Sequence, residues 1–459
     1  MYKIDFEKPI HIHFIGIGGI SMSGLAEILL KEGFTITGSD SKETKLTDKL
    51  SNLGATIYYG QRASNIKEPL DLVVYTAAIH DDNEELQEAK KREIPCISRA
   101  ELLGQIMNNY ANSIAISGTH GKTTTTSMVS QILLEAQADP TISVGGILKS
   151  IQGNIKVGTS PYFVTEACEY TNSFLHFNPK YSLILNIEED HLDFFKDLDD
   201  IRHSFRLFAE RLPKDGTLII NGEINGYEEI VRGLPCKVLT YGTDDRFRYG
   251  AANITFNEKA CATYDLLKDG VKLETIHLNV PGLHNVSNSV ASIALGLELG
   301  LSMDTMKKAF VHFTGTDRRF EYKGDLKGIT IIDDYAHHPT EIKATLHAAK
   351  DYPAKNIWCI FQPHTYTRTH AFLKEFASAL SLSDKIILTD IYAARETNEL
   401  GISSKDLEQE LKKLGAEVYY FPTFDEVEHF VLEHVLPDDL LITMGAGDVV
   451  KIGENLLGK

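Results

Sequence analysis

The sequence predicts an α/β protein of three domains, and three observations lead to this expectation. Its 459 residues exceed what a single hydrophobic core organises, and typical domain sizes give about three compact units. Apolar runs typical of buried strands alternate with helical patterns along most of the chain. Glycine turns directly follow two of these runs, at residues 16–19 and 118–121. We therefore expect parallel sheets that present ligand-binding turns at their strand ends.

The composition is that of an ordinary globular protein, with 43% hydrophobic and 24% charged residues. Lys and Arg number 46 against 64 Asp and Glu, and this net charge of −18 disfavours nucleic acid or an anionic membrane as a partner. The five cysteines form no Cys-x-x-Cys pair, as expected in a reducing cytoplasm without a zinc cluster. The first ten residues do not resemble a signal peptide, and no apolar run is long enough to span a membrane. We expect a cytoplasmic protein.

The first domain is predicted to span residues 1–109 as a Rossmann-like unit. Its elements are expected to be strands at 11–15, 35–37 and 72–75 and helices at 23–32 and 84–92. Alternation of strand and helix implies that the strands are parallel.

The central domain is predicted to span residues 110–322. A strand at 113–116 leads into a glycine loop and a threonine-rich helix start, and further strands are expected at 162–165 and 181–187. Between residues 217 and 278 the pattern changes to short segments of mixed polarity, with turns at Asn221-Gly222 and Asp269-Gly270, which predicts a small antiparallel addition. Pro281-Gly282 then introduces a helix that reaches residue 299.

The third domain is predicted to span residues 323–459, after the polar, aperiodic segment 313–320. It is expected to be another Rossmann-like α/β unit. Its elements are strands at 329–333, 356–361, 385–389, 417–421 and 440–444 and a helix at 340–350.

The loop after the strand 113–116 has the composition of a phosphate-binding loop. It reads Gly118-Thr119-His120-Gly121-Lys122-Thr123-Thr124. Exposed backbone N–H groups and a helix N-terminus bind phosphate oxygens, Lys122 adds a full positive charge, and Thr123 offers a hydroxyl to Mg²⁺. A full Walker pattern has a glycine where this chain has Ile116, so an ordinary strand-to-helix turn is the alternative. The chain has no Asn-Lys-x-Asp motif, which favours ATP over GTP.

Two further residues stand at predicted strand ends, where α/β proteins place ligand groups. Glu166 ends the strand 162–165 and is suited to complete a Mg²⁺ shell, although a solvated strand end is an equal alternative. His191 follows the strand 181–187, and a single histidine there is equally compatible with packing or helix capping.

The opening glycine turn is close to a dinucleotide-binding fingerprint. Gly16 and Gly18 fit that pattern, Ser21 stands at its third position, and Asp40 ends the second strand where a ribose-binding acid is usual. A nicotinamide-dependent dehydrogenase is therefore one hypothesis. The second nucleotide loop at Gly118 argues against it, because a dehydrogenase has no use for a Lys-Thr phosphate loop.

Six segments taken together resemble the Mur ligases. They are residues 117–125, 166–169, 186–193, 282–285, 318–320 and 334–339. The resemblance extends over nearly the whole chain, and the opening segment 16–26 is similar to the family members that add the first amino acid. It implies an ATP-dependent ligase that joins L-alanine to the carboxylate of UDP-N-acetylmuramate through an acyl phosphate, in peptidoglycan synthesis.

The resemblance also implies residue roles. The UDP-sugar is expected on Gly16, Gly18, Gly19, Ile20, Ser23 and Asp40. ATP is expected on Gly118, Thr119, His120, Gly121, Lys122, Thr123, Thr124, His284, Asn285, Asn288, Arg319, Asp334 and Tyr335. Catalysis is expected to depend on Lys122, Glu166, His191 and Arg319, and two Mg²⁺ ions on Thr123, Glu166 and His191. The incoming amino acid is expected to face His337 and Arg368.

The chain departs from the family pattern at two places. Thr365 stands where some relatives have an additional arginine, and residues 197–212 contain no lysine that could form a carbamate near the second metal ion. The alternatives to an alanine-adding enzyme are a related ligase that recycles murein peptide or adds glutamate, the dehydrogenase, and a non-catalytic nucleotide-binding module. A monomer or a weak homodimer is expected.

Overall fold

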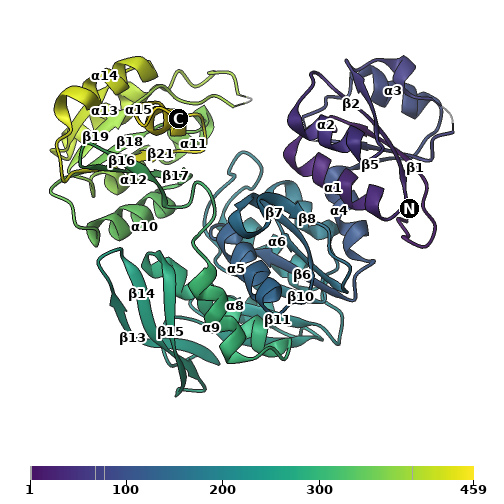
Figure 1. The fold of residues 1–459 in the computed structure, drawn as a ribbon, viewed down its shortest axis with the longest axis horizontal. Helices are drawn as coiled ribbons and strands as arrows, with labels where there is room; N and C mark the ends of the chain where they lie inside the picture. Colours follow the sequence, from purple (N-terminus) through teal and green to yellow (C-terminus); the bar gives the residue numbers. More distant parts are fainter. Residues whose placement is uncertain (1–2, 68, 77, 395) are drawn as a thin grey trace. The chain divides into compact units, whose positions relative to one another are not determined.

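The computed structural model describes residues 3–67, 69–76, 78–394 and 396–459, and it shows an α/β protein with three sheets, as the sequence predicts (Figure 1). The chain divides into two compact units. The first comprises Met1–Glu188 and Leu198–Thr240, and the second comprises Glu189–Asp197 and Tyr241–Lys459. The domain boundaries expected after residues 109 and 322 stay predictions.

The first sheet has the strand order β3-β2-β1-β4-β5, and all of its strands are parallel. Its strands are β1 (His11–Ile15), β2 (Thr35–Asp40), β3 (Thr56–Tyr59), β4 (Leu72–Tyr75) and β5 (Cys96–Ser98). Its helices are α1 (Ile20–Lys31), α2 (Lys45–Asn52), α3 (Glu84–Lys91) and α4 (Arg99–Met107), with a short 3₁₀ turn η1 (Ala63–Asn65). The strand order reverses between β1 and β4, which is the position where α/β sheets bind ligands at the carboxyl ends of their strands.

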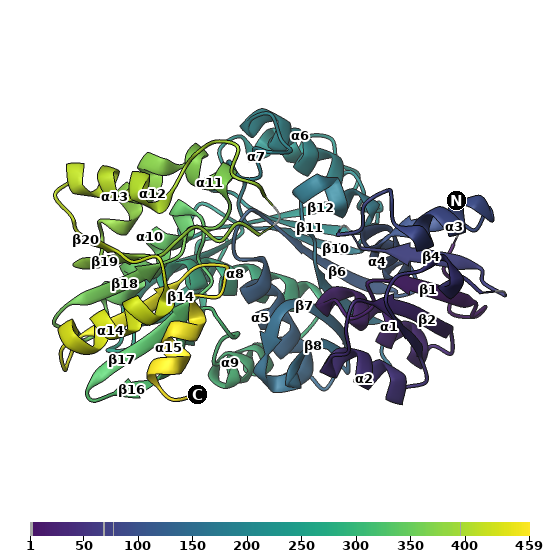
Figure 2. The ribbon, with the colours of Figure 1, turned by 90° about the horizontal axis from the view of Figure 1, so that it is seen from above.

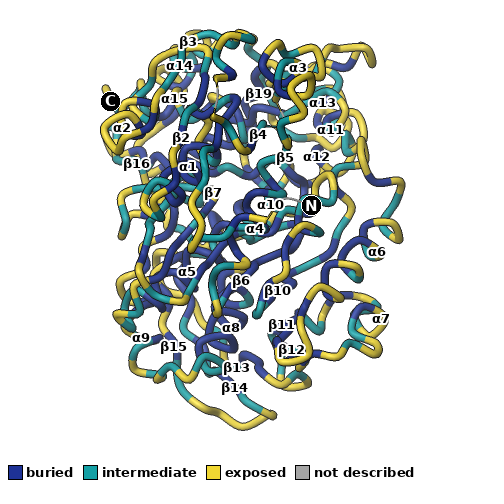
Figure 3. Tube along the Cα trace, turned by 90° about the vertical axis from the view of Figure 1, so that its right-hand side faces the viewer, coloured by how far each residue is buried: buried dark blue, intermediate teal, exposed yellow. Residues whose placement is uncertain are grey.

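In the first unit the second sheet has the order β12-β11-β10-β6-β9-β7-β8. Its strands are β6 (Asn112–Ser117), β7 (Thr141–Leu148), β8 (Gly153–Lys156), β9 (Tyr162–Glu166), β10 (Tyr181–Ile184), β11 (Thr217–Asn221) and β12 (Lys237–Tyr241). The helices are α5 (Lys122–Glu135), α6 (Leu198–Ala209) and α7 (Tyr227–Val231), with 3₁₀ segments η2 (Lys149–Ile151) and η3 (Tyr170–His176). The strands β6 and β10 are almost wholly buried (Figure 3), as expected of a parallel sheet covered on both faces.

The antiparallel addition expected from residue 217 begins later than predicted. Strand β11 pairs in parallel with β10, Thr217 opposite Tyr181, because α6 provides the crossover between them. The antiparallel strands lie in the second unit: β13 (Tyr249–Phe256), β14 (Cys261–Lys268) and β15 (Val271–Pro281), followed by α8 (Leu283–Glu298) and α9 (Met303–His312). The turn between β14 and β15 places Asp269 and Gly270 at φ values of 52° and 74°, as a tight two-residue hairpin requires.

The third sheet has the order β16-β17-β21-β18-β19-β20, and only β16 is antiparallel to its neighbour. Its strands are β16 (Glu321–Leu326), β17 (Ile329–Asp334), β18 (Ile357–Phe361), β19 (Lys385–Leu388), β20 (Glu417–Tyr420) and β21 (Leu440–Met444). Its helices are α10 (Pro339–Lys350), α11 (Tyr366–Ala371), α12 (Leu373–Leu380), α13 (Ser404–Lys413), α14 (Phe424–His434) and α15 (Val450–Leu456).

Along the central strands of this third sheet, successive residues pack into two separate hydrophobic cores. Ile332 and Ile442 pack with α10, α12 and α13, whereas Ile331 and Leu441 pack with α14 and α15. This division follows from the alternation of side chains along a strand. Figure 2 shows the two helix layers on opposite faces of the sheet. Over the described part of the chain, no helix combines the length and the apolar character needed to cross a bilayer.

Candidate active site

The predicted phosphate loop joins β6 to α5 in a conformation that requires glycine at two positions. Gly118 and Gly121 have φ values of 143° and 82°, which L side chains rarely adopt. A Cβ atom on Gly118 would also lie 2.9 Å from Cβ of Leu185. No side chain caps the N-terminus of α5, which leaves the first backbone N–H groups of that helix to a ligand or to water. The loop therefore has the backbone of an anion-binding turn.

The ammonium group of Lys122 is held inside this loop. It donates hydrogen bonds to the carbonyl oxygens of Gly118 and Thr119 and forms an ion pair with Glu169 at 2.9 Å. The side chains of Lys122 and Glu169 are only 16% and 3% exposed. Burial alone would lower the pKa of Lys122, but the Glu169 carboxylate outweighs it and raises that pKa above its usual value. Lys122 is thus fully charged at any physiological pH.

The segment that follows β10 is hydrogen-bonded to the phosphate loop. The backbone N–H of His120 donates to Oδ1 of Asn186 at 2.7 Å, and Nδ2 of Asn186 donates back to the carbonyl of His120 at 3.0 Å. The N–H of Glu188 donates to Oγ1 of Thr119 at 2.9 Å. The strand expected at 181–187 ends at Ile184, because residues after it form hydrogen bonds with the phosphate loop instead of with a neighbouring strand.

Glu166 lies beside the start of the phosphate loop. It ends β9, where it pairs with Ile116 of β6, and its Oε1 accepts a hydrogen bond from the N–H of Gly145 at 2.5 Å. A Cβ atom on Gly145 would lie 2.9 Å from both carboxylate oxygens. Thr123 is buried in the first turn of α5, with Thr124 next to it. The carboxylate and the threonine hydroxyl are hard oxygen donors, the kind that Mg²⁺ prefers.

In the second unit, Arg368 is bound to a carboxylate that lies 178 residues away in the sequence. Its Nη2 and Nε atoms donate to Oδ1 of Asp190 at 2.8 and 3.2 Å, and the two side chains are 10% and 8% exposed. Burial alone would raise the pKa of Asp190, but the Arg368 guanidinium holds it well below its usual range. His191 follows at a φ of 52°, with its Nε2 3.7 Å from Oδ2 of Asp190.

His337 is a neutral imidazole near pH 7. Its Nδ1 lies 3.0 Å from the carbonyl oxygen of Tyr335 and 3.3 Å from the Glu341 carboxylate. Burial lowers the pKa of His337 to about 4 in spite of Glu341. A proton on Nδ1 that is donated to the carbonyl leaves Nε2 as the basic atom of the ring.

The segment around Arg319 packs around the ring of Tyr335. The guanidinium carbons of Arg318 and Arg319 lie 4.8 and 5.2 Å from the ring centroid, and Arg319 is 3.9 Å from Glu341. Arg318 itself is engaged with Asp333 at 3.0 Å and with the carbonyl of Gly445.

Asp334 binds the backbone of the same segment. It accepts hydrogen bonds from the N–H groups of Phe320 and Ala336 at 2.9 and 2.7 Å, while burial raises its pKa to about 6. The structure thus gives Asp334 a local structural role beside the predicted contact with ATP.

The helix α8 presents the polar residues that the sequence singles out at its N-terminal end. Asn285 donates to the carbonyl of Pro281 at 2.7 Å and accepts from Nδ2 of Asn288 at 3.0 Å, and both are buried. His284 is exposed. Asn285 therefore ties the first turn of α8 to the residue before it, which is a local structural role beside the predicted contact with ATP.

In the first domain, Asp40 is tied to the opening glycine turn. Its Oδ2 accepts from the N–H of Gly18 at 2.7 Å, and a Cβ on Gly18 would lie 2.8 Å from that oxygen. Gly16 has a φ of 82°, and Gly19 precedes α1 without a side-chain cap. The hydroxyl of Ser23 is turned to the carbonyl of Ile20, whose side chain is 61% exposed. The turn, Asp40 and the start of α1 form one cluster at the carboxyl edge of the sheet.

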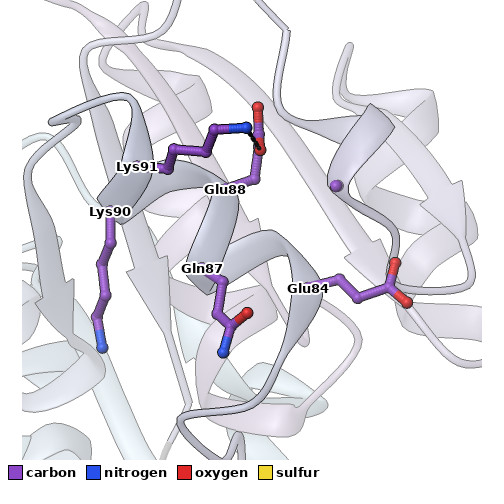
Figure 4. A pocket seen from close by; sticks show the side chains of 6 residues that line it. Glu84, Gln87, Glu88, Lys90 and Lys91 are labelled. Carbon is purple, nitrogen blue, oxygen red and sulfur yellow. Dashed lines mark ion pairs between the residues drawn. The ribbon is translucent and has the colours of Figure 1, made fainter.

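Sequence reasoning missed three residues of these clusters: Glu169, Asn186 and Asp190. All three stand shortly after predicted strands, so a strand-end signal was available. A surface hollow of the first unit runs along α3 (Figure 4) and shares no lining residue with these clusters; it is lined by Ala63, Glu84, Gln87, Glu88, Lys90 and Lys91.

A phosphate loop with a largely buried lysine, carboxylates at strand ends and a second α/β unit with clustered arginines are the features of a nucleotide-dependent enzyme. Comparison with known proteins agrees with this class. The model described as "Mur ligase family, catalytic domain" matches residues 11–111, "Mur ligase middle domain" matches 116–296, and "Mur ligase, glutamate ligase domain" matches 318–447.

Full-length relatives give the same result. The chain is 61% identical over 459 residues to UDP-N-acetylmuramate–L-alanine ligase of Agathobacter rectalis and 58% identical to that of Lachnoclostridium phytofermentans, with complete coverage of both chains in each case. The solved UDP-N-acetylmuramate–alanine ligase of Thermotoga maritima has a TM-score of 0.81 at 32% identity, covering 98% of each chain. The chain belongs to the Mur ligase family of ATP-dependent ligases. The predicted resemblance is confirmed, and the family decides against the dehydrogenase.

Proposed function

We propose that this protein joins L-alanine to the carboxylate of UDP-N-acetylmuramate, with cleavage of ATP to ADP and phosphate, as a step of peptidoglycan synthesis. One observation supports this most strongly: relatives of that name are 50–61% identical over 98–100% of the chain. A ligase that recycles murein peptide is less well supported. The solved murein peptide ligase of Psychrobacter arcticus is 26% identical, with a TM-score of 0.71.

The proposed first step is attack of the sugar carboxylate on the γ-phosphate of ATP, which gives an acyl phosphate and releases ADP. Nucleophile and electrophile are both anionic, and two unit charges 4 Å apart repel by roughly 4 kcal/mol at an effective dielectric of about 20. Lys122 and Arg319 would offset this repulsion by binding phosphate oxygens. The buried position of Lys122 supports this role, because a charge shielded from water acts more strongly on a phosphate.

Two Mg²⁺ ions are part of the proposal. Thr123 and Glu166 fit one ion, since both offer oxygen atoms next to the phosphate loop, and His191 would hold the other. Bound Mg²⁺ would neutralise charge on the transferred phosphoryl group. In this proposal the N–H groups of residues 118–124 bind the phosphates of ATP. The other contacts with the nucleotide would come from His284, Asn285, Asn288, Asp334 and Tyr335.

The proposed second step is attack of the alanine amine on the acyl carbon of the acyl phosphate, which forms the amide bond, breaks the C–O bond and releases phosphate. Arg368 would bind the alanine carboxylate. Nε2 of the neutral His337 would accept a proton from the amine. Thr365 offers no second guanidinium, so recognition of the carboxylate depends on Arg368. The UDP-sugar is proposed to lie on Gly16, Gly18, Gly19, Ile20, Ser23 and Asp40.

We further propose three domains at residues 1–109, 110–322 and 323–459, a monomer or weak homodimer, and a cytoplasmic location where ATP and UDP-linked sugars are available.

The substrate is tested by measuring phosphate release from ATP with UDP-N-acetylmuramate and one amine at a time: L-alanine, glycine, L-serine, D-glutamate and a murein tripeptide. Release that depends on L-alanine is expected. Phosphate release that occurs with the tripeptide and not with L-alanine would contradict the proposal and favour the recycling ligase.

The metal assignment predicts the behaviour of Glu166→Gln. Removing one anionic ligand of Mg²⁺ is expected to lower kcat by about 10- to 100-fold and to raise the Mg²⁺ concentration needed for half-maximal rate. The melting temperature should change little, because the amide oxygen can still accept the N–H of Gly145. Asp139→Asn, at an exposed ion pair with Lys156, is the matched control. Unchanged turnover at every Mg²⁺ concentration would remove Glu166 from the metal site.

A further inference from the structure

Arg99 stands in a position that is electrostatically unfavourable for a cation. It is the first residue of α4, where the partial positive charge of the helix dipole opposes a guanidinium. Its side chain is partly shielded from solvent, and this burial lowers the pKa of Arg99. Helix stability does not explain an arginine here.

The expected compensation, a carboxylate partner, is not present. Across the described residues, no carboxylate forms an ion pair with Arg99, and of its five N–H donors one has a partner, Oγ of Ser21 at 3.1 Å. The nearest acid in the same helical turn, Glu101, is engaged elsewhere, because its Oε2 accepts the N–H of Ser98 at 2.7 Å in a capping box. The N–H groups of Arg99 without a partner among the described residues are open to a ligand, and an anionic ligand would supply the missing counter-charge.

The location of Arg99 indicates which anion this is. The residue follows β5, and the opening glycine turn follows β1, so both lie at the carboxyl edge of the same parallel sheet. Its partner Ser21 belongs to the first turn of α1, whose N-terminus has no side-chain cap. Figure 1 shows α1 and α4 next to each other in this domain. The guanidinium is therefore one hydrogen bond away from the helix terminus that is suited to bind a phosphate group.

We infer that Arg99 is a positioning residue for the UDP-sugar, whose pyrophosphate it binds together with the N-terminus of α1. This inference rests on the proposed function, because it takes the substrate to be a UDP-linked sugar. A guanidinium matches phosphate oxygens with two parallel N–H groups, and Ser21 fixes its orientation before the ligand arrives. Arg99 acts on binding of the substrate and takes no part in the transfer chemistry.

The test compares ligands that differ only in the pyrophosphate. Binding of UDP and of uridine to the full-length protein is measured by calorimetry for the wild type, Arg99→Gln, Arg99→Lys and Arg92→Gln. Arg92 is the matched control, an exposed arginine of the same domain paired with Glu88 on α3. Arg99→Gln is expected to weaken UDP binding by about 10- to 100-fold and to leave uridine binding unchanged, with Arg99→Lys in between. Arg92→Gln should bind both ligands as the wild type does.

Two further readouts separate this role from a structural one. The melting temperature of ligand-free Arg99→Gln should stay close to that of the wild type, because no described carboxylate loses a partner and glutamine can still donate to Ser21. In steady state, KM for UDP-N-acetylmuramate should rise about 10-fold or more, while KM for ATP and kcat stay within about twofold.

Equal losses of UDP and uridine binding, or wild-type affinity of Arg99→Gln for UDP, would overturn the inference alone. A wild-type protein that binds neither ligand would overturn the proposed function of the first domain as well.

Discussion

Lys122→Met is expected to lower kcat for ATP cleavage by about 10²- to 10³-fold, because the substitution removes the only full positive charge of the phosphate loop. It is also expected to destabilise the protein by about 3–5 kcal/mol, because Glu169, 3% exposed, is left as a buried carboxylate without its partner. Phosphate release and urea denaturation of the variant measure the two effects.

A double variant separates catalysis from stability at this position. Lys122→Met combined with Glu169→Gln removes both charges, so most of the lost stability should return while turnover stays as low as in the single variant. Recovery of activity in the double variant would show that Lys122 serves only to neutralise Glu169. Lys156→Met, at the surface ion pair with Asp139, controls for the loss of a lysine elsewhere in the unit.

Arg368→Lys is expected to raise KM for L-alanine by about 10-fold or more with little change in KM for ATP. Lysine keeps the positive charge beside Asp190, so the protein should stay folded, but an ammonium cannot bind two acceptors in the planar geometry of a guanidinium. Initial rates at varied L-alanine and varied ATP measure this difference. Equal increases of both KM values, or a wild-type KM for L-alanine, would contradict the role of Arg368 in binding the amino acid.

Arg368→Ala extends this experiment to stability. It leaves Asp190, 8% exposed, without a counter-charge, and we expect a loss of about 3–5 kcal/mol in the free energy of unfolding. Arg246→Ala, which breaks an exposed pair with Asp244, should change that free energy by less than about 1 kcal/mol.

The sequence predicted the buried strands of the parallel sheets well, because a short apolar run between turn signals is typical of a strand that is covered on both faces. The strands at 11–15, 72–75 and 440–444 begin and end where they were expected. The direction of β11 was wrong, because alternation of polarity reports which face is buried and says nothing about the direction of a neighbouring strand. The strand β5 was missed because three residues are too few to show a period.

The parts of the candidate site that consist of residues adjacent in the sequence were predictable. The loop from Gly118 to Thr124 is such a case, since its glycines and its lysine adjoin one another. The strand-end signal could have pointed to Glu169 and Asp190, but their roles and that of Arg99 were not predictable, because each role depends on a distant partner or on the lack of one. No spacing in the sequence indicates that Asp190 meets Arg368, and only the fold shows that Arg99 lies beside Ser21.

The hydrogen bonds of Lys122 to the carbonyls of Gly118 and Thr119 have a consequence for the kinetics of nucleotide capture. The loop is ordered around its own ammonium group before any phosphate arrives, so the conformational entropy of ordering it is lost during folding and not during binding. ATP then meets a rigid cradle and needs no loop closure at this position, which favours rapid association. The same lysine would thus serve as a template for the turn before it serves as a ligand for phosphate.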